Sequence, residues 1–325
     1  MDATTATTPP PERTTPRAHA PGIYIGLPAD EYHGDEALGS TDIRALRRGI
    51  KFVHQDTPAT VLGTAMHMLV LDGRDAFNAA YHRRPGEYAD MSTGDKSKMT
   101  KALKAEYPFM EILPAEDYDL CVDSLKIIDG NPDLAGCMLG GLSEVSVFWE
   151  RDGFRLKCRF DKLKLNGVGD LKTIANERHK NLEEACLYDI KYRQYGMQAA
   201  HYLDGRSRLP ALLKNGCVYD GATGEALSRK DGPKAVLDYL DKVAAKGGNS
   251  AFQFVFLQKE PPATTWSTFF DSTDPLIELW RDHVDSALAR YPAHLDKFHA
   301  PGGWSTIEPV RKVVMSDFPG GEFGW

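Results

Sequence analysis

Apolar and polar residues alternate across residues 159–173, and this pattern predicts a β-hairpin. An Asn-Gly dipeptide at 166–167 separates the two halves, and both of its residues tolerate the positive φ angles of a two-residue type I′ turn. With this turn, Asp161 would pair with Lys172. Because side chains alternate between the faces of a strand, Asp161, Asp170 and Lys172 would then share one face, with direct cross-strand neighbours about 5 Å apart.

The remaining pattern mixes helices and strands, which predicts an α/β fold with a central sheet. Helical spacing dominates residues 40–135, and a long helix is expected over 182–203. Further strands are expected at 216–219, 251–257 and 264–271, and another helix at 275–291.

Composition divides the chain of 325 residues, 42% of them hydrophobic, into three parts. Residues 1–20 are rich in threonine and proline and are expected to be a disordered leader. Residues 21–300 can bury one large core, within which 205–248 are interpreted as an insertion or a subunit contact. Residues 301–325 are rich in glycine and aromatic residues, and we expect an extension that packs at a subunit interface.

Two carboxylates beside a lysine favour a site for a hard divalent cation such as Mg²⁺, which takes oxygen ligands. A solvated hairpin with a cross-strand ion pair remains the alternative. Two other signals are open in the same way. His67 lies in the middle of a predicted buried helix and is either a metal ligand or a core residue with satisfied hydrogen bonds. Gln198 shares a helix face with Tyr202; the two either belong to the site, or Tyr202 fills the core and Gln198 faces solvent.

Charge and cysteine usage narrow the function classes. A formal net charge of −7 does not suit a protein that coats DNA through general phosphate neutralisation. Basic residues instead gather locally, and each group is either a solvated face or a DNA-guiding surface; the candidates are Arg44, Arg48, Lys96, Lys98 and Arg178. The five cysteines form no C-x₂-C pair, which argues against a zinc ribbon, a disulfide framework or an iron–sulfur cluster. The chain shows neither a signal peptide nor a membrane-spanning stretch, so a reducing cytoplasm is expected.

Several short motifs occur together in a recognisable order between residues 22 and 262. They are LGSTDI at 38–43, GTAMH at 63–67, SEVSV at 143–147, RFD at 159–161, GDLKT at 169–173, QAAHY at 198–202 and QKEPP at 258–262. In this order the chain resembles the RecB-type branch of the PD-(D/E)XK nucleases, and within it the exonuclease VIII (RecE) family of phage and prophage origin. Leu171 stands where many members of the superfamily have glutamate, and Phe160 stands where the superfamily's name has proline.

The resemblance implies a restriction-endonuclease-like core and assigns roles to individual residues. Asp161, Asp170, His67 and the backbone carbonyl of Leu171 would bind Mg²⁺ or Mn²⁺, and Glu144 could reach a second ion or a ligand water. Lys172 would orient or help to deprotonate the attacking water. Gln198 and Tyr202 would support this group.

The implied activity is metal-dependent exonuclease cleavage of linear double-stranded DNA from its 5′ ends, which leaves 3′ single-stranded tails. A homo-oligomeric ring and a single-strand annealing protein as partner are also implied. Two alternatives stay open from the residues alone: an endonuclease on the same core, or a catalytically silent DNA-binding module of phage origin.

Overall fold

The structure is a computed structural model that describes residues 18–49, 58–176, 181–230, 232–246 and 250–298. The predicted C-terminal extension at 301–325 lies outside these residues, and so does all but the end of the predicted leader at 1–20.

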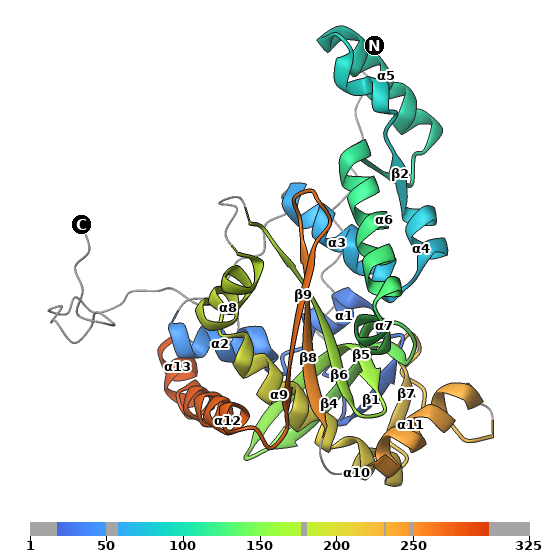
Figure 1. The fold of residues 1–325 in the computed structure, drawn as a ribbon. Helices are drawn as coiled ribbons and strands as arrows, with labels where there is room; N and C mark the ends of the chain where they lie inside the picture. Colours follow the sequence, from blue (N-terminus) through green and yellow to red (C-terminus); the bar gives the residue numbers. More distant parts are fainter. Residues whose placement is uncertain (1–17, 50–57, 177–180, 231, 247–249, 299–325) are drawn as a thin grey trace, which may run out of the picture.

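A mixed sheet of seven strands is the centre of the described fold, in the order β7-β1-β4-β5-β6-β8-β9 (Figure 1). Its strands are β1 (Gly22–Ile25), β4 (Leu142–Arg151), β5 (Phe154–Lys164), β6 (Gly167–Ile174), β7 (Val218–Asp220), β8 (Ala251–Gln258) and β9 (Thr265–Asp271). Parallel pairing joins β1 to β7 and β6 to β8, and the other neighbours are antiparallel. Strand β8 reads AFQFVFLQ, a nearly continuous apolar run of the kind that forms a strand covered on both faces. The predicted α/β fold with a central mixed sheet is confirmed.

Helices cover both faces of the sheet, and the two larger of the three hydrophobic cores in the described residues lie on opposite faces. The larger core joins one face to α2 (Ser40–Arg48), α8 (Leu182–Tyr192), α9 (Tyr195–Ser207), α10 (Leu209–Lys214), α11 (Lys234–Lys246) and α12 (Pro275–Leu288), after which α13 (Tyr291–Phe298) follows. The smaller core packs α3 (Pro58–Leu71), α6 (Ala115–Gly130) and α7 (Pro132–Met138) against Leu171 and β8 on the other face. Segment 205–248 contributes β7 at the sheet edge and α11 to the larger core.

An arm projects from the α3 and α6 side of the sheet (Figure 1). It contains α4 (Arg74–Ala80), β2 (Tyr81–Arg83), a 3₁₀ turn (Gly86–Asp90), α5 (Thr93–Glu106) and β3 (Glu111–Leu113), with β2 and β3 paired in parallel. Helix α5 lies at its far end. No helix in the described part of the chain is both long enough and apolar enough to cross a lipid bilayer.

The single helix predicted over 182–203 is wrong, because the chain breaks between α8 and α9. Gln194 adopts a left-handed conformation with φ of 57°, which ends the regular hydrogen-bond ladder. Gly196 then permits a close helix crossing, since a Cβ there would lie 2.1 Å from the indole of Trp280 in α12. The break reorients the chain so that α9 packs against the sheet in the larger core.

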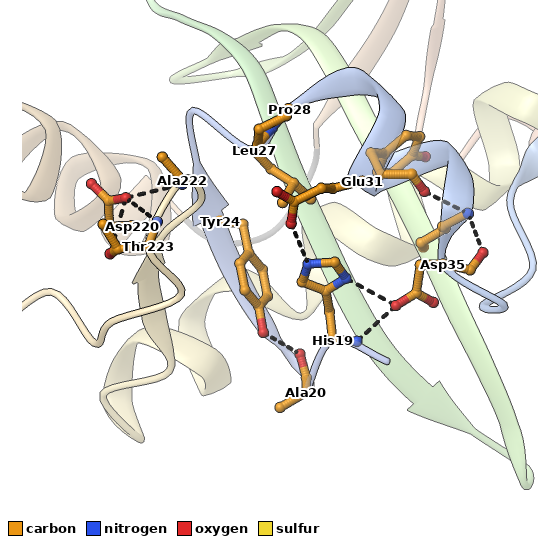
Figure 2. Close-up of polar contacts among 12 residues, drawn as sticks. His19, Ala20, Tyr24, Leu27, Pro28, Glu31, Asp35, Asp220, Ala222 and Thr223 are labelled. Atoms are coloured by element: carbon orange, nitrogen blue, oxygen red, sulfur yellow. Dashed lines mark hydrogen bonds and ion pairs between the residues drawn. The ribbon is translucent and has the colours of Figure 1, made fainter. Parts of the chain in front are cut away.

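A buried polar cluster fastens the N-terminal strand and α1 (Ala29–Gly34) to the sheet (Figure 2). The backbone N–H of His19 donates to Asp35 Oδ2 at 2.7 Å, and His19 Nδ1 lies 2.9 Å from the same oxygen. Burial alone would raise the pKa of Asp35, but these contacts, the backbone N–H of Ala37 and the charge of Arg155 together lower it. The Tyr24 hydroxyl donates to the Ala20 carbonyl at 3.0 Å in the same region.

Candidate active site

Strands β5 and β6 form the predicted hairpin, but with a different turn. Lys164 pairs with Gly167, so the loop consists of Leu165 and Asn166. Neither Asn166 nor Gly167 has a positive φ, and the predicted type I′ turn at 166–167 is wrong. Gly167 serves packing instead: a Cβ on it would lie 2.1 Å from the carbonyl oxygen of Ala251 in the neighbouring strand β8.

This register changes the partner of Asp161. The last paired positions of the hairpin are Lys162 and Gly169, and one further step sets Asp161 opposite Asp170. The predicted pairing of Asp161 with Lys172 is therefore wrong by two residues. The Asp161 carboxylate lies against β6, where its Oδ2 accepts a 2.8 Å hydrogen bond from the backbone N–H of Leu171. The hairpin thus brings the two aspartates together more directly than the predicted register does.

Glu144 lies on β4, on the other side of Asp161. The regular β4–β5 pairing skips these two positions, and Glu144 has a φ of 53°, unusual for a residue with a side chain. Its carboxylate lies 3.5 Å from Arg159 Nη1. Burial, reinforced by the negative charge of Asp161, raises the pKa of Glu144 to about 7. The glutamate therefore belongs to the same electrostatic cluster as the aspartates.

Asp170 is held between two donors. Its side chain is 1% exposed; Oδ1 accepts a 2.7 Å hydrogen bond from Gln198 Nε2, and Oδ2 accepts one from Lys172 Nζ. Burial raises the pKa of Asp170 to about 6, although the charge of Lys172 opposes this shift. Helix α9 supplies Gln198, so the break before α9 is what places the amide over the hairpin.

Lys172 is enclosed by aromatic rings as well as by carboxylates. Its Nζ lies 5.1 Å from the centroid of the Tyr195 ring and 5.9 Å from that of Phe254. Burial would lower the pKa of Lys172, but the charges of Asp170 and Asp161 outweigh it, and the pKa is raised. The side chain is therefore an ammonium at neutral pH.

Helix α3 delivers His67 to the same strand. Its Nδ1 lies 2.8 Å from the Gly63 carbonyl, and its Nε2 lies 2.9 Å from the carbonyl oxygen of Leu171. Helix and strand approach closely because Gly63 has no side chain: a Cβ there would lie 3.1 Å from Thr173 Oγ1. If Nδ1 carries the proton and donates it within the helix, the Nε2 lone pair faces a second acceptor. The Nε2 lone pair and the Leu171 oxygen would then repel each other unless a cation or a second proton on the imidazole lies between them.

Residues 44–211, just over half of the chain, match the family described as "PDDEXK-like domain of unknown function (DUF3799)". The chain belongs to this family. The assignment to the PD-(D/E)XK superfamily and the restriction-endonuclease-like α/β core, both expected from the motifs, are thereby confirmed. Among solved structures, the chain is similar to a "Putative exonuclease" from Eubacterium rectale, with 12% identity and a TM-score of 0.49 over 91% of this chain and 99% of that chain. No curated protein matches the chain.

The donors of this PD-(D/E)XK domain suit a divalent cation, which members of this class generally use. Nowhere in the described ranges do three or more His, Cys, Asp or Glu side chains gather as a metal cluster. Here, however, the donors include the backbone carbonyl of Leu171, whose oxygen lies 2.9 Å from His67 Nε2. In the tautomer with the proton on Nδ1, both of these atoms can offer lone pairs to a cation. Asp161 and Asp170 add carboxylate oxygens beside Leu171. This mixture of imidazole and oxygen donors fits Mg²⁺ and, more readily, Mn²⁺.

Three further predicted residues lie near the PD-(D/E)XK site in different ways. Tyr202 is buried, with its ring edge-to-face against Phe160 and Phe252 at centroid distances of 5.9 Å, so it supports the site through the core. Arg44 lies over the Tyr195 ring at 5.4 Å, and Arg48 lies over the Tyr192 ring at 5.2 Å. Both arginines are on α2, beside the junction of α8 and α9.

The other predicted DNA-binding residues are not brought to this place. Lys96 and Lys98 are on α5 at the far end of the arm, where Lys96 Nζ donates to the Ala89 carbonyl at 2.8 Å and Lys98 Nζ lies 3.5 Å from Asp95 Oδ1 (Figure 1). Arg178 lies outside the described residues.

The tyrosines around the α8–α9 junction were missed as site residues. Tyr188, Tyr192 and Tyr195 stand at i, i+4 and i+7, the spacing of one helix face, and all three fall within the single helix predicted over 182–203. The break at Gln194 separates them, so that Tyr195 contacts Lys172 while the other two stay exposed. The repeated tyrosine spacing next to lysine and arginine was the available signal.

Proposed function

We propose that this protein is a metal-dependent exodeoxyribonuclease that hydrolyses phosphodiester bonds of linear double-stranded DNA. The observation that carries the proposal is the contact of Lys172 with Asp170 beside His67 Nε2 and the Leu171 carbonyl. A buried ammonium, paired carboxylates and an imidazole facing a carbonyl provide what hydrolysis of a phosphodiester needs: a place for a metal and a fixed positive charge.

Each residue has a distinct task in the proposed reaction. Gln198 and Lys172 hold Asp170 from both sides and fix the orientation of its carboxylate. The raised pKa of Lys172 favours a role in which the ammonium orients water and stabilises negative charge on the phosphate, rather than one that removes a proton. His67, Asp161, Asp170 and the Leu171 carbonyl would hold a divalent ion, which when bound lowers the pKa of water and neutralises phosphate charge.

Glu144 is proposed as an accessory group. It lies next to Asp161, with its carboxylate 3.5 Å from Arg159 Nη1, and from there it could reach a second ion or a ligand water.

The finer parts of the proposal rest on the resemblance to the exonuclease VIII family. They are cleavage from 5′ ends, production of 3′ tails for recombination by strand annealing, a homo-oligomeric ring and an annealing protein as partner, acting in the cytoplasm of a bacterial or phage-infected cell. The ordered motifs from residues 38 to 262 support this assignment.

The test uses two duplexes, one linear and labelled at its 5′ ends and one covalently closed and circular, each with Mg²⁺ or Mn²⁺. Wild type is compared with Asp170→Asn, which keeps the shape of the side chain, and with Asp95→Asn on α5 as a control. We expect release of 5′ label from the linear duplex alone by wild type and control, and no release by Asp170→Asn or in EDTA. Nicking of the circle would favour an endonuclease, whereas binding without cleavage under either ion would favour a silent DNA-binding module.

A further inference from the structure

Two tyrosines on α8 expose most of their rings to solvent. Tyr188 and Tyr192 are each 61% exposed and stand one helical turn apart on a helix whose buried residues are Cys186 and Ile190. Their rings are parallel, with an interplanar angle of 9° and centroids 5.5 Å apart. Large exposed apolar groups that are already ordered in a stack are typical of a binding surface.

Basic side chains lie beside this pair. The guanidinium of Arg48, from α2, lies 5.2 Å from the Tyr192 centroid and extends the row of planar groups. Arg48, Lys191 and Gln194 line a surface pocket of about 510 Å³ together with the two tyrosines. Asp189, which stands between the tyrosines in sequence, is bound to Arg193 Nε at 2.9 Å, so its charge is offset. In a chain with a net charge of −7, such a surface selects an anionic ligand with flat rings.

The surface continues into the candidate active site. Tyr195, just beyond the break at Gln194, contacts both Lys172 Nζ and the guanidinium of Arg44 through its ring, at 5.1 and 5.4 Å. Arg44 Nη1 donates to the Arg193 carbonyl at 3.0 Å and so joins α2 to the α8–α9 junction. Arg44 and Arg48, four positions apart on α2, therefore connect the Tyr195 ring beside Lys172 with the exposed pair.

We infer that Tyr188, Tyr192 and Arg48 form a stacking platform for the bases of a single DNA strand, the strand that enters the active site. This inference rests on the proposed nuclease function and adds a substrate form to it. Bases present their flat faces only when they are unpaired, whereas a duplex presents phosphates and groove edges. Stacking on aromatic rings with cations along the backbone binds single strands of any sequence, as a nuclease without sequence preference requires.

The test measures binding separately from cleavage. Fluorescein-labelled oligo(dT) and a blunt duplex of equal length are titrated with the full chain in EDTA, and affinity is read from fluorescence anisotropy. Tyr188→Ala and Tyr192→Ala should each weaken oligo(dT) binding by about tenfold or more. Tyr188→Phe and Tyr192→Phe should bind like wild type, because the ring is kept. Phe269→Ala, which removes a 62% exposed aromatic ring on β9, is the matched control and should change nothing.

A second readout reports direct contact. Oligo(dT) with 5-iododeoxyuridine in place of one thymidine is photo-crosslinked to wild type, and the attached peptide is identified by mass spectrometry. Attachment within α8 at Tyr188 or Tyr192 supports stacking. Attachment elsewhere, with unchanged affinity in both alanine variants, overturns the inference.

The remaining outcomes are also decisive. Equal losses for oligo(dT) and duplex would replace the platform with a general backbone contact. A shift in sedimentation of the alanine variants, without loss of DNA binding, would assign the tyrosines to an interface between copies. If wild type binds oligo(dT) through the two tyrosines but cleaves no DNA, the platform stands and the proposed nuclease function is rejected. If the alanine variants cleave and bind like wild type, the platform alone is rejected.

Discussion

Gln198 Nε2 donates a 2.7 Å hydrogen bond to Asp170 Oδ1 although the two residues lie 28 positions apart on different elements. Removing the amide leaves a buried carboxylate oxygen without a donor, which disturbs the orientation of Asp170. Gln198→Ala should therefore lower the cleavage rate by about 10- to 100-fold while the protein stays folded. Initial rates and circular dichroism check this. Gln253→Ala, which removes a hydrogen bond to Ser267 on the same sheet, is the control; an unfolded Gln198→Ala protein would instead make the glutamine structural.

Substitutions of Lys172 and Asp170 should distinguish the stabilisation of phosphate charge from the binding of the metal. Lys172→Ala removes the ammonium but no proposed ligand, so cleavage should fall by about 10²- to 10³-fold while Mn²⁺ affinity persists. Asp170→Ala should lose both. Isothermal titration with Mn²⁺ alongside rate measurements distinguishes the two variants, and Mn²⁺ affinity retained by Asp170→Ala would remove this aspartate from the ligand set.

Metal should stabilise the fold through His67. An ion present at about 100 times its dissociation constant adds about 2.7 kcal/mol to the free energy of unfolding. Mn²⁺ should therefore raise the melting temperature of wild type by several degrees, EDTA should reverse the rise, and His67→Ala should show little of it. Differential scanning fluorimetry measures the shift, with His82→Ala on the arm as a control. An equal Mn²⁺ response in His67→Ala would place the ion elsewhere.

Stability in acid should depend on Asp35. Its pKa is lowered in the folded protein, so its contribution is present above the ordinary carboxyl value of about 3.9 and is lost as pH falls through the lower folded value. Asp35→Asn should lose stability near neutral pH, by about 1.5–3 kcal/mol for a hydrogen-bonded charge, and should depend less on pH below about 4 than wild type does. Urea unfolding from pH 7 to 3 tests this, with Asp95→Asn as control. Parallel curves for wild type and Asp35→Asn would contradict it.

Local patterns predicted the parts of the fold that neighbours in sequence determine. Alternation located β5 and β6, and it brought Asp161, Asp170 and Lys172 into one cluster before the fold was known. The predicted turn was misplaced because glycine is needed at position 167 for a different reason. Gly167 packs against Ala251, on a strand more than 80 residues away. The turn preference of the Asn-Gly dipeptide contains no information about such a distant contact.

The α8–α9 break shows the same limit. Residues 182–203 carry a helical pattern without proline, and nothing local marks Gln194 as the residue that turns left-handed. Packing of Gly196 on Trp280 and of Tyr195 on Lys172 depends on elements that meet only in the folded chain. The proposed ligands could be named from ordered motifs, but the aromatic enclosure of the lysine could not.

The missing side chain at Gly63 has a consequence for the position of His67. It lets α3 settle against β6, where a Cβ at residue 63 would lie only 3.1 Å from Thr173 Oγ1. This close approach leaves His67 Nε2 2.9 Å from the Leu171 oxygen. A methyl group at residue 63 would push the helix and its imidazole away from the strand, so one absent side chain keeps the two candidate ligand atoms next to each other.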